Sequence, residues 1–444
     1  MLSLPDAARR GGLVRRGPHL WRVVDFLYVV ASFLPYLALP LGASTNIPLT
    51  SLLAPLWLPR ALRYPRLLAV VGLLAFAPLV TGYFGMLVGR PVSNPFALVT
   101  WAAYVLPVAV IAVLVIESSE QVVRAIAFGA GASALFVLFQ QWAIARGTVP
   151  FLAYYDMPGY AAIRPDLVVN YIRRPFGLFP EPSFMAGTLA LATTAMVLLL
   201  RASSRRLAPV HYAVVALVLT ALVVSRSGSA VVAGLVLLGV VLAPHARGLR
   251  WPLVFGAVGT GGAFVAAQIL ERRSSAVDFS WSDRSASIVA AFAHTAEDPV
   301  TALLGVGRGH AAHLFSTGEI SLSSFEVVGA VQDIYSVLGR VAVEAGFVCG
   351  VVLIVSGYAA HRGAHAASAE RNGRLVGLLA GVLWVVVAGL TISYDSAAWI
   401  WLSLGIALGV RLQREDGGGL EEPDLGEQRR QAVAIDTETT ARTA

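Results

Sequence analysis

The sequence contains no lysine and little charge of any kind. All 33 basic side chains are arginines, and charged residues make up 13% of the 444 positions, whereas they make up roughly a quarter of a soluble protein. Hydrophobic residues account for 57% of the chain, and the mean hydropathy is +0.72. This composition excludes a water-soluble globular enzyme and is typical of an integral membrane protein.

Cysteine is almost absent as well. The single cysteine, Cys349, lies in an apolar run, so the chain has no intramolecular disulfide and no cysteine-rich metal site. The formal net charge of +7 does not indicate nucleic-acid binding, because a membrane protein is expected to carry a basic excess in its cytoplasmic loops.

Apolar stretches of about 17 to 25 residues are long enough to cross a bilayer as helices. They predict an all-α, polytopic transmembrane bundle of about twelve spans. The second stretch contains three prolines and could instead be a re-entrant segment that does not cross the membrane. The number of spans would then be eleven. The predicted spans are 21–40, 47–60, 67–88, 97–116, 121–143, 183–200, 207–224, 228–243, 251–270, 335–358, 375–393 and 396–411.

The distribution of arginine predicts the orientation. With the amino terminus inside, 22 of the 33 arginines fall in cytoplasmic segments, as the positive-inside rule requires. We therefore expect a multi-pass protein of the cytoplasmic (inner) membrane with both termini in the cytoplasm. Residues 1–20 form the cytoplasmic N-terminal tail, 21–411 the membrane domain, and 412–444 a polar, disordered cytoplasmic tail. No cleavable signal peptide is expected, because Met1 to Arg22 is polar.

Most of the remaining arginines lie in two long loops that this orientation puts outside the cell, at about 144–182 and 271–334. Both are longer than helix connections need, and such loops usually carry function. In the second loop, Ser282 and Asp283 precede an amphipathic stretch, which predicts a short helix in the membrane interface.

The first loop ends with a segment, Arg174–Phe184, directly before an apolar span. Pro182 suits the first turn of a helix, so Glu181 would stand at the positive end of that helix. Capping of the helix by Glu181 is slightly favoured over a chemical role on spacing alone. Arg226, in the tight turn Ser225–Gly228, is either a substrate ligand or an arginine that snorkels to the interface.

Two further arginines of the second loop are candidate anion ligands. Arg284, at a helix start, could receive a phosphate or diphosphate, or be a solvated surface residue. The segment Gly305–Gly309 has no strand-helix-strand context, so it is not a dinucleotide site; its glycines turn Arg308 and His310 inward. A lone histidine is more often structural than catalytic, and His294 and His313 are equally available.

Arg340 and Glu344 are four residues apart in an apolar segment, so they meet on one helix face. Ionisable groups inside a membrane are costly and mark either an internal pair or a substrate path. We expect these two to neutralise each other.

Taken in order, these motifs resemble the O-antigen ligase and O-antigen polymerase superfamily of bacterial envelope polysaccharide enzymes. Arg174–Phe184 is similar to the family segment R-x-x-G-x-F-x-E-P-S, and Ser225–Gly228 is similar to its S-R-[ST]-G turn. The resemblance covers about residues 170–350. The other matching positions are Arg284, Pro299, Gly305–Gly309, Tyr335 and Glu344–Phe347.

The resemblance implies a metal-independent membrane glycosyltransferase without a cofactor. Such an enzyme takes a glycan from an undecaprenyl (polyprenyl) diphosphate carrier and joins it to an acceptor glycan hydroxyl on the outer face. Its partners would be this lipid-linked oligosaccharide, the acceptor glycan, membrane lipid, and flippase and chain-length regulator proteins; no nucleic acid is expected.

The resemblance also implies roles for single residues. Arg174, Arg226 and Arg284 would grip the diphosphate, with Arg308 as a further candidate. Guanidinium forks suit diphosphate and would stabilise the charge that develops as it leaves. Glu181 would be the acid-base or acceptor-positioning group. Family ligases carry a histidine before the segment matching Ile334–Tyr335, where this chain has Asp333, so the general base is open between Asp333, Glu181 and His310.

Three functions stay open on the sequence. The Glu-Pro-Ser segment favours an exopolysaccharide polymerase. A ligase that hands the glycan to a lipid or protein acceptor is the second. The third is a non-catalytic transporter of the lipid-linked sugar, which is disfavoured because no internal repeat is evident and the charges lie away from the membrane midplane.

Overall fold

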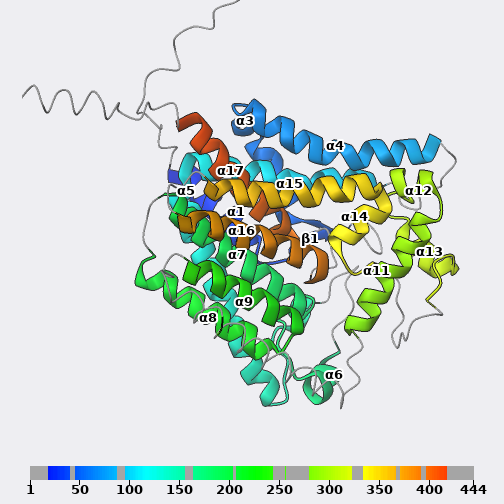
Figure 1. Ribbon diagram of the computed structural model, residues 1–444. Coiled ribbons are helices and arrows are strands. Elements are labelled where there is room, and N and C mark those ends of the chain that lie inside the picture. Colours follow the sequence, from blue (N-terminus) through cyan, green and yellow to red (C-terminus); the bar gives the residue numbers. More distant parts are fainter. Residues whose placement is uncertain are drawn as a thin grey trace, which may run out of the picture.

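The computed structural model describes residues 19–40, 46–87, 96–155, 164–203, 207–243, 256, 280–322, 334–366, 371–391 and 397–417. These residues form a bundle of helices whose axes run in roughly one direction, with α11, α12 and α13 gathered at one end (Figure 1). We call this the α11 end. The predicted mostly helical class is confirmed.

The helices other than those of the α11 end and the short connecting pieces make up the body of the bundle. They are α1 (His19–Ala31), α4 (Pro65–Leu87), α5 (Phe96–Ala145), α7 (Pro182–Ala202), α8 (Pro209–Ser225), α9 (Gly228–Leu242), α15 (Phe347–Ala366), α16 (Arg371–Val386) and α17 (Ala398–Gly417).

The other elements connect these helices or lie at the α11 end. They are β1 (Ala38–Pro40), β2 (Asn46–Pro48), α2 (Leu49–Leu53), η2 (Ala54–Trp57), α3 (Leu58–Ala61), η3 (Leu152–Tyr155), α6 (Pro165–Leu167), η4 (Val168–Ile172), α11 (Ser280–Ala296), α12 (Pro299–Leu304), α13 (Ala311–Thr317), α14 (Val337–Ala345) and η6 (Val387–Thr391). The two strands pair antiparallel, with Leu39 opposite Ile47.

Three stretches among the described residues are helical, long and apolar enough to cross a membrane: Thr100–Ala145, Pro182–Ala202 and Phe347–Ala364. The first is two helices joined at a bend, because Ser118 has non-helical backbone angles (φ −157°, ψ 56°). The bend separates the predicted segments 97–116 and 121–143. Four more apolar helices have 10 to 17 residues. Association with a membrane is therefore supported, whereas the number of spans stays a prediction.

Three predicted spans are not single helices. The segment 21–40 is helical only to Ala31, and β1 follows Pro35. The segment 47–60 is divided into β2, α2, η2 and α3 because its prolines interrupt the helical hydrogen bonds. The segment 335–358 is broken at Gly346, whose φ is +90°. A Cβ at this glycine would lie 1.9 Å from the Leu303 carbonyl oxygen, so the contact with α12 requires glycine.

The other predicted spans correspond to helices, except 251–270, which lies almost wholly outside the described residues. The second long loop contains α11, α12 and α13, in agreement with the expected short helices. Helix α17 continues to Gly417, into the segment 412–444 that is predicted as the C-terminal tail. The remainder of that tail and residues 1–18 lie outside the described residues.

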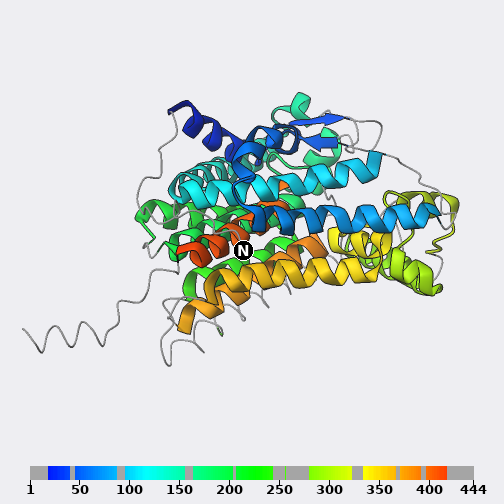
Figure 2. The ribbon, with the colours of Figure 1, turned by 90° about the horizontal axis from the view of Figure 1, so that it is seen from above.

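The core is centred on α7, in which every residue from Ser183 to Leu200 is buried. Helices α5, α9 and α17 pack around it, and α5 also contacts α1, α4 and α8. The helix α15 lies at an edge of the bundle (Figure 2), and large apolar side chains on it, such as Val351 and Val355, are exposed. Helix α7 is therefore a central helix enclosed by others, and α15 is a peripheral helix.

Candidate functional site

The turn before α7 is held by a buried amide in α5. The Gln140 side-chain oxygen accepts hydrogen bonds from the backbone N–H groups of Phe176 and Gly177, each at 2.8 Å. The Tyr155 hydroxyl donates to the Gly177 carbonyl at 2.7 Å and accepts from the Gln140 amide at 3.2 Å. Gln140 and Tyr155 are both fully buried. These bonds fix the path of the chain that leads to Glu181.

Gly177 is required in this turn for two reasons. Its φ is +62°, a conformation that side chains with a Cβ rarely adopt. A Cβ would also lie 2.8 Å from Val137 Cγ2 on α5. The glycine of the Arg174–Phe184 segment is therefore explained by local geometry.

Glu181 lies at the N-cap position of α7 with an extended backbone, and Pro182 occupies the first turn as predicted. Its side chain makes no capping hydrogen bond. The favoured capping interpretation is therefore wrong as far as a side-chain hydrogen bond is concerned. The carboxylate instead accepts from the Ser183 hydroxyl at 3.0 Å and forms an ion pair with Arg284.

Arg284 reaches this carboxylate from α11, 103 positions further along the chain. Its guanidinium also lies 3.3 Å from the Ser183 hydroxyl. We call Glu181, Ser183 and Arg284 the Glu181 cluster. The Arg284 side chain is 16% exposed and that of Glu181 is 39% exposed. The cluster therefore joins the two long loops and keeps one carboxylate accessible to solvent.

The pair is exposed mainly on its carboxylate side, where water competes for Glu181 and weakens the pair. An anionic ligand could therefore replace Glu181 on the Arg284 guanidinium at little cost. Release from Arg284 would leave the carboxylate free to accept a proton.

Arg226 lies at the same end of the bundle as Glu181. Short connections join α7 to α8 and α8 to α9, so successive helices alternate in direction, and α7 packs along α9. Arg226 adopts the left-handed conformation (φ 51°, ψ 27°), is exposed, and makes no side-chain hydrogen bond or ion pair with another described residue. This strained conformation costs about 1 kcal/mol or more and often marks functional sites.

Arg174 is half-buried and follows another strained arginine, because the φ of Arg173 is +49°. The Arg173 guanidinium donates to the Val169 carbonyl at 3.3 Å. Left-handed arginines therefore occur both next to Arg174 and at Arg226.

Arg308 belongs to a second group of charges. Glu344 is fully buried and accepts hydrogen bonds from Arg308 and, at 3.2 Å, from Arg340. We call these three residues the Glu344 cluster. The predicted pairing of Arg340 with Glu344 is confirmed. The sequence did not predict that Arg308 joins it.

The loop that carries Arg308 is fixed to α14. The backbone N–H groups of Val306 and Gly307 donate to the carbonyls of Val343 (2.9 Å) and Glu344 (3.1 Å). The Arg308 guanidinium lies 5.0 Å from the centre of the Trp101 ring, within cation–π range. Burial lowers the pKa of Arg308, and the Glu344 carboxylate opposes this shift. Arg308 is therefore a buried arginine whose side chain is held by contacts within the protein.

His310 is buried and precedes α13, and its ring lies 5.0 Å from the ring of His313. Asp333 lies outside the described residues. The choice of general base between Glu181, His310 and Asp333 therefore stays open. Glu181 is paired with Arg284, one of the predicted diphosphate ligands.

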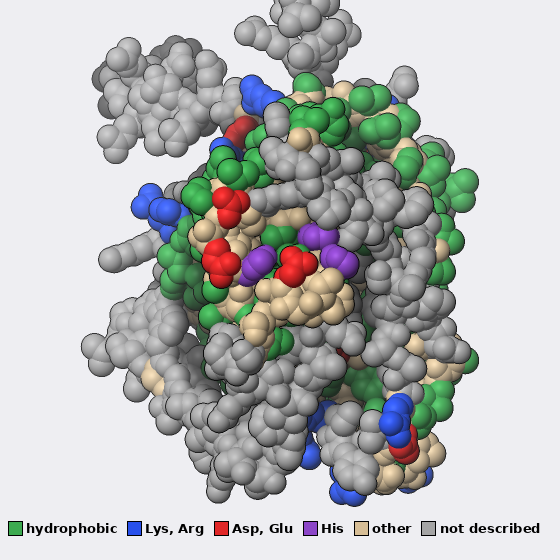
Figure 3. Space-filling view, turned by 90° about the vertical axis from the view of Figure 1, so that its right-hand side faces the viewer, with side chains coloured by type: hydrophobic (Ala, Val, Ile, Leu, Met, Phe, Trp, Pro, Cys, Tyr) green, Lys and Arg blue, Asp and Glu red, His purple; other side chains and the backbone are tan. Residues whose placement is uncertain are grey.

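The surface of the α11 end is acidic and histidine-rich where it is described (Figure 3). Exposed or partly exposed residues there include His294, Glu297, His313 and Glu319. Two arginines of this end, Arg284 and Arg308, instead pair with Glu181 and Glu344. Within the residues that the structure describes, no three histidine, cysteine or acidic side chains form a group that could hold a metal ion.

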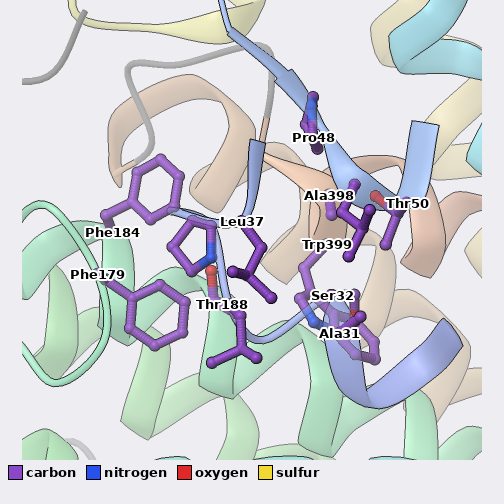
Figure 4. A pocket seen from close by; sticks show the side chains of 13 residues that line it. Ala31, Ser32, Leu37, Pro48, Thr50, Phe179, Phe184, Thr188, Ala398 and Trp399 are labelled. Atoms are coloured by element: carbon purple, nitrogen blue, oxygen red, sulfur yellow. The ribbon is translucent and has the colours of Figure 1, made fainter. Parts of the chain in front are cut away.

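A small cavity lies beside the start of α7 (Figure 4). Phe179 and Phe184, which flank Glu181 in sequence, line it together with Thr188, and Thr50 and Trp399 contribute from α2 and α17. It has room for about one water molecule. None of the four predicted diphosphate ligands lines this cavity, so it is not the expected substrate site.

Sequence reasoning missed Gln140, Tyr155 and Trp101. The available signal for Gln140 was its amide inside an apolar segment of membrane-spanning length, where polar groups are expensive. Tyr155 and Trp101 gave no comparable signal, since aromatic residues are frequent throughout the chain.

No protein-family model matches this chain, and no curated protein matches it.

Proposed function

We propose that this protein is a membrane glycosyltransferase that transfers a glycan from a polyprenyl diphosphate carrier to an acceptor sugar hydroxyl. In this proposal it is a polysaccharide polymerase of the cytoplasmic membrane, works on the outer face and keeps both termini in the cytoplasm. The Glu181 cluster carries the proposal, because a carboxylate, a hydroxyl and a guanidinium from the two long loops meet at one end of an apolar bundle.

The cluster suits this chemistry through competition for Arg284. A bound diphosphate would take the guanidinium from Glu181, and bidentate contacts to phosphate oxygens favour this exchange. Arg174 lies on the same loop as Glu181, and Arg226 lies at the same end of the bundle. Both would add positive charge to the site. The guanidinium groups would then stabilise the negative charge that grows on the leaving diphosphate.

The transfer step needs one base. The acceptor oxygen forms a bond to the anomeric carbon while the bond from that carbon to the diphosphate oxygen breaks. The acceptor proton passes to the Glu181 carboxylate and then to solvent. The polyprenyl diphosphate leaves as an anion. His310 and Asp333 are the other candidates for the base, and Arg308 would contact the diphosphate only if the Glu344 cluster opened.

Reconstitution of the purified protein with a lipid-linked oligosaccharide tests the proposal. We expect a ladder of products that differ by one repeat unit, and we expect Arg226→Ala and Arg284→Ala to lose most turnover. A single transferred unit would indicate a ligase, and movement across the membrane without a new bond would indicate a transporter. Unchanged yield in both alanine variants would refute the proposed site.

A further inference from the structure

The outer side of α15 and α16 contains an apolar groove with one charged residue. It has a volume of about 750 Å³ and is lined by Val355 and Tyr358 on α15 and by Val382 and Val386 on α16. Arg362 is the charged residue among those that line it. A volume of this size accommodates a small-molecule or lipid chain.

Glycines set the spacing of the two helices. A Cβ at Gly381 would lie 2.8 Å from the Tyr358 ring, and a Cβ at Gly357 would lie 2.3 Å from the Trp384 ring. The rings pack directly onto the facing backbone, as small residues permit between membrane helices. The valines beside these contacts stay open to the surroundings: Val355 is 58% exposed and Val382 is 36% exposed. These exposed valines line the groove, so the groove is open to the surroundings. Its helix α15 lies at an edge of the bundle (Figure 2).

Arg362 lies near the end of α15 that is remote from α14, and its side chain is exposed. Other arginines gather at the same end. The Arg414 guanidinium donates to the Ala364 carbonyl at 2.7 Å, and the Arg411 side chain lies beside Gly363. Glu415 is the described carboxylate that pairs with Arg411. Positive charge therefore exceeds negative charge where the groove ends.

We infer that this groove binds one anionic glycerophospholipid of the adjacent leaflet. Its acyl chain lies along the valines of α15 and α16, and its phosphate contacts Arg362. Charge complementarity selects this occupant, because an apolar partner helix would cover Arg362 without neutralising it. The inference rests on the membrane embedding in the proposed function and is independent of the transfer reaction.

Lipid binding to the full-length protein tests the inference. The affinity of phosphatidylglycerol is measured by native mass spectrometry, with phosphatidylethanolamine of the same chain length as the neutral probe. Arg362→Ala should weaken phosphatidylglycerol binding about fivefold, as expected for one basic residue at a lipid surface. Val355→Trp fills the groove and should reduce the binding of both lipids. Arg374→Ala removes an exposed arginine that does not line the groove and should change neither affinity.

Unchanged lipid affinity in Arg362→Ala and Val355→Trp would overturn the inference, as would an equal loss in Arg374→Ala. A dimer that Val355→Trp disrupts would assign the groove to a second copy of the chain, which also overturns it. Unchanged unfolding midpoints without added lipid would show that the variants fold. Glycan transfer is scored separately, so failure to transfer would reject the proposed enzyme and leave the lipid result standing.

Discussion

The two clusters of charge place the same residue types in different surroundings. Glu181 is partly exposed and has one arginine partner, whereas Glu344 is fully buried and has two. Under the proposed function, the first carboxylate exchanges its partner and a proton with the substrate. The second is locked, because removal of one partner would leave a buried charge uncompensated. Function is therefore expected at Glu181 and stability at Glu344.

Glu181→Gln keeps the shape of the side chain and removes its ability to accept a proton. We expect glycan transfer to fall by about 10² or more, as is typical for loss of a general base. The unfolding midpoint should stay nearly constant, because the pair with Arg284 is partly exposed. Glu297→Gln, an exposed glutamate on the same end, is the control for both measurements. Full turnover in Glu181→Gln would assign the proton to His310 or Asp333.

Glu344→Gln should have the opposite profile. Loss of the carboxylate leaves the buried Arg308 without its ion-pair partner, so we expect a destabilisation of about 3–5 kcal/mol. Thermal unfolding in detergent measures this effect. A midpoint equal to that of the unaltered protein would show that the Glu344 cluster is not structural.

The turn that leads into helix α7 depends on its contact with helix α5. Gln140 binds two successive backbone N–H groups, and Gly177 allows the turn to approach Val137. The sequence predicted that Glu181 precedes a helix, because Pro182 and the apolar run mark its start. It did not reveal which residue holds the turn, since the partners are separated by 36 or more positions.

Gln140→Leu should shift the turn and therefore Glu181. Two buried N–H groups lose their acceptor, at about 1–3 kcal/mol each. We expect lower transfer activity together with lower stability. Gln141→Leu alters the neighbouring residue, whose side-chain oxygen has no hydrogen-bond partner among the described residues, and should lower neither activity nor stability. Equal activity in the two variants would remove Gln140 from the positioning role.

Gly346→Ala tests the break between α14 and α15. The φ of +90° and the closeness of the Leu303 carbonyl both oppose a side chain here. We expect a loss of unfolding free energy larger than the roughly 1 kcal/mol typical of substitutions. Gly72→Ala in α4, where a Cβ would meet nothing within 4 Å among the described residues, serves as the control. A neutral Gly346→Ala would indicate that the two helices can join into one.

At the scale of the whole molecule, hydropathy predicted where most helices lie but not where they break. Proline divides the 47–60 segment, and a tertiary contact with Leu303 divides the 335–358 segment. The first cause is visible in the sequence, whereas the second depends on a neighbour more than forty positions away. The pairing of Glu181 with Arg284 likewise joins residues that are far apart in the sequence. From the sequence alone, they could be identified only as two charged residues on two different loops.

The central claim is that Arg284 receives the diphosphate of the donor, and donor affinity tests it most directly. Undecaprenyl diphosphate binding is measured for the protein in nanodiscs, with Arg124→Ala, an exposed arginine paired with Glu120, as the control. We predict that Arg284→Ala weakens binding about tenfold or more and that Arg284→Lys recovers part of it, because lysine lacks the guanidinium fork. Equal affinity in the original protein, Arg284→Ala and Arg124→Ala would contradict the account.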